Sequence, residues 1–113
     1  MKLKQLKEVI DAIVIYENNE EHNYKHGFAT DLMSDALAMI DYGEETILIT
    51  GLVNMQSLRT AEMLDITTIL FVRNKKPDED MINLAKDLDI NLYSTEYTMY
   101  EACGKLYAEG LLV

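Results

Sequence analysis

The feature that most constrains the fold is a regular alternation of short apolar runs with helix-length segments. Three runs are rich in β-branched and apolar residues and show no polar alternation: residues 46–50, 67–72 and 90–93. Such runs are typical of strands that are buried on both faces. Segments with apolar residues at helical spacing follow them, at about 55–64, 78–88 and 96–108. This order predicts parallel strands joined by right-handed helical crossovers.

The first forty residues extend the same pattern less regularly. Residues 2–11 predict a helix, residues 12–16 a strand and residues 17–21 a turn. Residues 22–28 fit either a short strand or a loop, and Thr30 or Asp31 is expected to cap a helix that runs to Ile40. We therefore predict an α/β fold over residues 1–113: a single three-layer domain whose mostly parallel sheet is flanked by helices. The pattern leaves the strand order open.

Composition excludes several classes of partner. Twenty acidic against ten basic residues give a net charge of −10, which repels nucleic-acid backbones and anionic membranes. One cysteine cannot form an internal disulfide. No apolar run approaches the ~20 residues of a membrane span, and no signal-peptide pattern opens the sequence. These features favour a cytoplasmic protein that binds neither nucleic acid nor membrane.

Polar residues follow three of the predicted strands at their carboxyl ends, where open parallel sheets usually bind ligands. A hydroxyl and a glycine follow the first strand, a cationic turn follows the second, and hydroxyls follow the third. We expect these turns to meet at one edge of the sheet. The candidate ligand-binding residues are Thr50, Gly51, Asn54, Arg73, Asn74, Lys75 and Thr95.

The turn at residues 73–76 carries the strongest chemical signal at this edge. It holds three of the ten basic residues of an acidic chain, and a helix start follows it. Such a turn suits a phosphate or a carboxylate. The alternative is that its lysines pair on the surface with Asp78, Glu79 and Asp80. No G-x-x-x-x-G-K-[ST] or G-x-G-x-x-G motif occurs, which argues against nucleotide hydrolysis and dinucleotide-dependent oxidoreduction.

Carboxylates and histidines offer two further hypotheses. Asp31 and Asp35 stand one helical turn apart and suit acid–base chemistry or a divalent cation, but a helix cap and a solvated side chain explain them equally well. His22 and His26, beside Glu20 and Glu21, suggest a metal, but no third histidine or cysteine completes a recognisable spacing. We therefore expect no metal or other cofactor.

Three other features have ordinary structural explanations. Arg59 is expected to pair with Glu62 or Asp65, and Cys103 is expected to be a buried, unreactive thiol. The seven methionines suit core filling. The apolar residues 111–113 suggest a surface that joins a homodimer.

Five short blocks stand out, at residues 31–35, 49–54, 59–64, 71–77 and 98–107. Together they resemble stand-alone bacterial DRTGG-domain proteins, although the Asp-Arg-Thr-Gly-Gly string itself does not occur. The resemblance extends from about Phe28 to Leu111. It implies a regulatory or dimerising module, similar to the domain found beside CBS domains in regulated pyrophosphatases and to the non-catalytic N-terminal part of HPr kinase/phosphorylase. It also implies an adenine nucleotide or related phosphorylated metabolite as ligand.

Three functional hypotheses follow. The leading one is a non-catalytic, dimerising regulatory domain that binds an anionic small molecule at the edge of the sheet. The alternative is a protein-interaction subunit whose acidic surface docks on a partner enzyme of unknown identity. The third is an enzyme that uses Asp31 and Asp35.

Overall fold

Five strands form one sheet in the order β1-β5-β4-β3-β2 in the computed structural model, which describes all residues 1–113. Strands β2 to β5 are parallel, and β1 runs antiparallel to β5. The predicted α/β fold with a mostly parallel sheet is confirmed. The strands are β1 (Ile13–Tyr16), β2 (His26–Ala29), β3 (Thr46–Thr50), β4 (Thr68–Phe71) and β5 (Asn91–Ser94).

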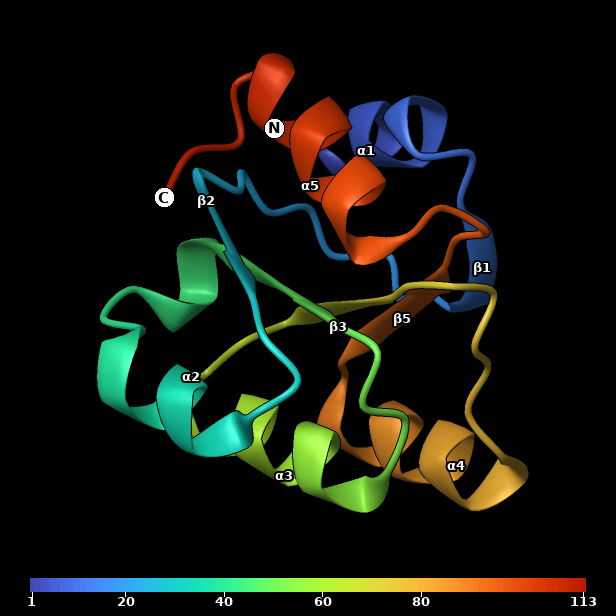
Figure 1. Cartoon of the computed structure of the whole chain (residues 1–113). Coiled ribbons are helices and arrows are strands. Elements are labelled where there is room, and N and C mark those ends of the chain that lie inside the picture. Colours follow the sequence, from blue (N-terminus) through green and yellow to red (C-terminus); the bar gives the residue numbers. More distant parts are fainter.

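Helices cover both faces of this sheet (Figure 1). Helices α1 (Leu3–Val9) and α5 (Met99–Ala108) lie on one face, and α2 (Met33–Met39), α3 (Met55–Met63) and α4 (Glu79–Leu88) lie on the other. A short 3-10 helix, η1 (Gly43–Glu45), leads into β3. The structure thus has the expected three layers.

Side chains along the buried strands point alternately to the two faces of the sheet, so a separate hydrophobic core lies on each face. Every residue of β3, β4 and β5 is buried. Ile47 and Ile49 pack with the α1 and α5 side chains, whereas Leu48 packs with those of α2, α3 and α4. Full burial of each such side chain contributes about 1.5–3 kcal/mol, which explains why these runs lack polar alternation.

Helix starts follow the sequence signals with one exception. Asn54 and Asp78 cap α3 and α4 by accepting hydrogen bonds from backbone N–H groups, and Thr98 forms a capping box with Glu101. The predicted cap of α2 is wrong: its first flanking residue is Leu32, and no side chain caps the helix. Asp31 instead accepts hydrogen bonds from the end of β3.

Strand β2 forms one outer edge of the sheet, and the C-terminal residues lie beside part of it (Figure 1). Gly27 N–H donates to Leu112 O (2.7 Å), and Leu112 N–H donates to Lys25 O (3.1 Å). The side chain of Leu111 is buried in the core, whereas Leu112 and Val113 are exposed. No helix has the length and apolar character needed to cross a membrane.

Candidate functional site

The turns after β3, β4 and β5 meet at one edge of the sheet, as predicted. Lys75 Nζ donates to Gly51 O (3.1 Å), which joins the second turn to the first. Asn74 N–H donates to Thr95 O (2.7 Å), which joins it to the third. Ser94 Oγ donates to Lys75 O (2.8 Å) from the end of β5. The cationic turn therefore lies between the other two and is fixed to both.

A cradle of hydrogen-bond donors lies at the end of β3, and the carboxylate of Asp31 fills it. Oδ1 of Asp31 accepts hydrogen bonds from Gly51 N–H (2.6 Å) and from the hydroxyl of Thr50 (3.1 Å). Nη2 of Arg73 lies 3.7 Å from the other carboxylate oxygen. Because β2 and β3 are neighbours in the sheet, the loop after β2 brings Asp31 to this position. The cradle is complementary to an oxyanion, and a carboxylate from the chain itself occupies it.

An unusual backbone conformation holds Arg73 over this cradle. Arg73 and Asn74 both have positive φ angles, 60° and 55°, which cost side-chain-bearing residues energy. The hydrogen bonds of their N–H groups to Tyr97 O and Thr95 O stabilise the turn. A Cβ on Gly51 would collide with the guanidinium of Arg73. Glycine at position 51 therefore allows the arginine to lie against the backbone.

Only part of the predicted set reaches the surface of this edge. Thr95 is buried, and its hydroxyl donates to Ile10 O (2.7 Å), so its side chain points into the fold. The side-chain oxygen of Asn54 is used as the cap of α3. Asn54, Arg73, Asn74 and Lys75 are exposed, whereas Thr50 and Gly51 are buried at the end of β3.

Asp31 is the member of this cluster that sequence reasoning assigned to another role. A carboxylate just before a predicted helix matches the pattern of a helix cap, and only the pairing of β2 with β3 reveals its contact with Gly51. The alternative role for the cationic turn is wrong as well. No ion pair joins it to the acidic start of α4, where Asp78 caps the helix and Arg73 faces Asp31.

The remaining sequence candidates do not assemble into a site. His22 lies near Glu20 and His26 near Glu45, and no group of three or more potential ligands has the geometry of a metal centre. The carboxylate of Asp35 makes no hydrogen bond or ion pair, whereas that of Asp31 contacts Thr50, Gly51 and Arg73. Arg59 pairs with Glu62 (3.3 Å), as expected.

The groups with shifted pKa values lie away from the cradle. Burial raises the pKa of the half-buried Cys103 thiol, which makes it a poor nucleophile. Burial and a hydrogen bond to Glu17 raise the pKa of Tyr93. For Glu17, burial acts to raise the pKa, but the Tyr93 hydroxyl and the Lys7 ammonium together lower it below its usual range. This cluster joins α1 to the β1 side of the sheet and is structural.

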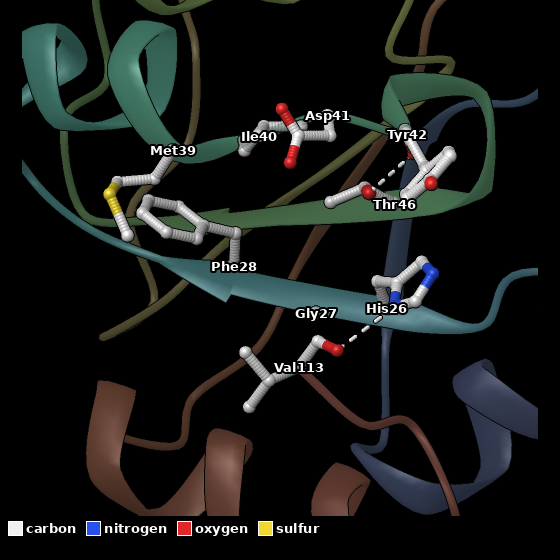
Figure 2. Close-up of a pocket in the computed structure, with 9 residues that line it drawn as sticks. All are labelled: His26, Gly27, Phe28, Met39, Ile40, Asp41, Tyr42, Thr46 and Val113. Atoms are coloured by element: carbon white, nitrogen blue, oxygen red, sulfur yellow. Dashed lines mark hydrogen bonds between the residues drawn. The ribbon is translucent and has the colours of Figure 1, made fainter.

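A hollow lies beside β2, near the amino ends of β2 and β3 (Figure 2). It has a volume of about 260 Å³ and lies between β2, the chain after α2 and Val113. The ring of His26 stacks on Tyr42 and its Nδ1 lies 3.0 Å from Val113 O. Phe28 and Met39 supply an apolar wall, and nothing in the sequence pattern indicated this pocket.

No protein-family model matches this chain, and no curated protein matches its sequence. A solved structure does match in shape: the CBS and DRTGG domains of the regulatory region of Clostridium perfringens pyrophosphatase, complexed with the activator diadenosine tetraphosphate. The TM-score is 0.69 at 16% sequence identity. The match covers 98% of this chain but only 47% of the pyrophosphatase chain, so this protein spans about half of that regulatory region. The chain therefore has a DRTGG-like α/β fold.

Proposed function

We propose that this chain is a non-catalytic regulatory domain that senses an anionic small molecule, such as an adenine nucleotide, at the carboxyl edge of its sheet. Two independent facts support the proposal. The structural neighbour is a regulatory region bound to a phosphate-rich activator. In this chain, the donors at the edge converge on a negatively charged group.

The single observation that carries the proposal is the oxyanion position marked by Asp31. A phosphate oxygen of the ligand takes the place of Oδ1 and receives the Gly51 N–H and the Thr50 hydroxyl, while Arg73 contacts a second oxygen. The Asp31–Arg73 pair is exposed, with about half of each side chain accessible, so its loss costs little. A phosphate gains stronger, charge-assisted hydrogen bonds in exchange.

A thermal-shift panel with ATP, ADP, AMP, diadenosine tetraphosphate and inorganic phosphate tests this proposal. A ligand at about 100 times its Kd stabilises the fold by roughly 2.7 kcal/mol. That raises Tm by roughly 10 °C, given about 4 °C per kcal/mol at the lower end of the range for domains of slightly smaller size. Arg73→Ala is expected to abolish the shift. Arg59→Ala, which removes an exposed arginine paired only with Glu62, is the matched control. A flat panel with the parent chain would remove the support for a nucleotide sensor.

Dimerisation is the second part of the proposal. Tyr100 lies in the first turn of α5 and is 89% exposed. Large exposed aromatic side chains are enriched where proteins associate. Sedimentation velocity over a hundredfold range of concentration tests for a dimer, and Tyr100→Lys is expected to weaken it. A monomer at all concentrations would refute this part and leave the sensor untouched.

The second candidate is a protein-interaction subunit that docks on a partner enzyme without a small-molecule ligand. The net charge of −10 favours it, because an acidic surface attracts a basic patch. A flat thermal-shift panel together with a salt-sensitive complex isolated from the native host would favour this candidate over the sensor.

A further inference from the structure

The outer edge of β2 has hydrogen-bonding groups that the fold leaves open. The backbone N–H and C=O groups of successive β2 residues point alternately toward β3 and away from it. Those of Phe28 and Thr30 point toward β3, since Thr30 N–H donates to Ile49 O. Those of Gly27 and Ala29 point outward, since Gly27 N–H donates to Leu112 O. Leu112 and Val113 lie beside the beginning of this edge. No strand of the sheet lies on the outer side of β2, so the N–H and C=O of Ala29 and the C=O of Gly27 face outward.

Two hollows border this open edge, one toward each face of the sheet. The first is the pocket of Figure 2, where Phe28 and Met39 form the wall on the α2 side. The second, of about 270 Å³, lies on the α5 side, where Gly27 and Ala29 leave room. Nine of its ten lining residues are hydrophobic, among them Leu106 and Tyr107. Adjacent side chains of a strand point to opposite faces, so a strand added to β2 places consecutive side chains in the two hollows.

Charge distinguishes the two hollows. Asp41 lines the first, and it also lines an adjoining pocket together with Glu44, Glu45 and Asp65. An arginine or lysine can lay its methylene stem on Phe28 and Met39 and place its charge beside Asp41. No charged side chain lines the second hollow, which suits leucine or isoleucine. A second copy of this chain suits the edge less well, because each copy has a net charge of −10.

We propose that the β2 edge is a docking slot for an extended segment of a partner protein in which basic and apolar residues alternate. The segment adds a strand to β2 through the backbone of Ala29 and Gly27. Its basic side chain enters the Met39 hollow, and the neighbouring apolar side chain enters the Leu106 hollow. This slot lies apart from the Arg73 edge and is independent of the proposed anion ligand.

The test measures fluorescence polarisation of a labelled synthetic peptide in which Arg and Leu alternate, with the full chain as receptor. Three controls have the same length: Glu in place of Arg, Ser in place of Leu, and a block peptide with all Arg before all Leu. The alternating peptide is expected to bind at least about tenfold more tightly than each control. Equal binding of the block peptide, or no saturable binding of the alternating one, would overturn the proposal.

Variants then locate the site. Met39→Lys and Asp41→Lys are each expected to weaken binding about tenfold by repelling the arginine. Met63→Lys changes an equally exposed methionine at the end of α3 and is expected to have no effect. Ala29→Pro removes the outward N–H that no residue of the chain accepts from, at a position where an edge strand tolerates proline. It should abolish binding, and circular dichroism checks its fold. Unchanged binding in both lysine variants would overturn the proposal, as would a dimer of the parent chain that Met39→Lys dissociates.

Discussion

The carboxyl edge of the sheet and the outer edge of β2 differ in how completely the chain satisfies its own polar groups. At the carboxyl edge, Gly51 N–H, the Thr50 hydroxyl and the Lys75 ammonium all have partners within the chain. At β2, the backbone of Ala29 faces outward between two hollows. The first region has many polar and charged groups, but the chain itself occupies them. The second region has open space but few functional groups.

Because of this difference, each of the two regions suits a different class of ligand. A filled polar site binds a ligand only by exchange, so the ligand must carry a stronger charge than the carboxylate that it displaces. A hollow apolar edge binds by filling space and by pairing backbone groups, so its ligand is an extended chain. The experiments below change one region while leaving the other intact.

The largest loss of stability is expected from Gly43→Ala, which disturbs the loop beside the β2 docking slot. Gly43 begins η1, and a Cβ there would overlap the backbone carbonyl of Leu64 at the end of α3. Backbone cannot move aside cheaply, so we expect a loss of roughly 3 kcal/mol in the free energy of unfolding, at the upper end for overpacking. Urea titration measures this loss.

Gly104→Ala is the matched control for this substitution. Gly104 lies in α5, and no atom lies within 4 Å of a Cβ added there. Replacing a helical glycine should stabilise the chain by about 0.5–1 kcal/mol. A Gly43→Ala variant as stable as the parent would show that the loop beside the slot shifts freely, and the slot would lose its rigid wall.

Asp31→Ala is expected to have the next largest effect, and it changes only the filled region. Removal of the carboxylate leaves the partly buried Gly51 N–H without its partner and should cost about 1–2 kcal/mol in chloride. Inorganic phosphate should restore more stability to this variant than to the parent, because the cradle is vacant. Thermal melts in phosphate and chloride at matched ionic strength measure both effects.

Asp31→Asn separates charge from hydrogen bonding at the same position. The amide oxygen still accepts from Gly51 N–H, so this variant should be more stable than Asp31→Ala and should bind phosphate less readily. If phosphate stabilises all three chains equally, the anion does not enter the cradle, and the proposed exchange is refuted.

A smaller difference in stability is expected between Arg73→Gly and Arg73→Ala. Both remove the guanidinium and should lose anion binding alike. At a φ of 60°, however, glycine is free of the strain that alanine suffers, so the glycine variant should be more stable by about 1 kcal/mol. Equal stability of the two variants in urea titrations would show that the turn relaxes when the arginine is lost.

The fold was largely predictable because its signals are local. The apolar run that contains Ile47 and Leu48 has no polar alternation, since helices cover both faces of β3. Asn54 and Asp78 stand where helix caps belong, and both act as caps. The strand order was not predictable, because no local pattern fixes which parallel strand lies beside which.

The limits of site prediction follow from that missing strand order. The approach of Lys75 to Gly51 was expected, since carboxyl ends of parallel strands share an edge. The role of Asp31 was not, because its contact with Gly51 depends on β2 lying next to β3. The slot was hidden for the same reason: Ala29 faces outward only because β2 is at the edge of the sheet.

The smallest change in stability is expected when the pH is lowered, and it provides a baseline for both regions. Burial would raise the pKa of Glu17, but its hydrogen bond from Tyr93 and its pairing with Lys7 lower it below the ordinary value of 4.5. A carboxyl group with a lowered folded-state pKa adds stability above that ordinary value, and the contribution disappears as pH falls through the folded pKa. Tyr93→Phe should therefore be less stable than the parent at neutral pH, and the difference should shrink below about pH 4.5. Urea titrations from pH 7 to pH 3 measure it. Because Glu17 belongs to neither region, a difference that stayed constant to pH 3 would show that the acid sensitivity does not come from Glu17.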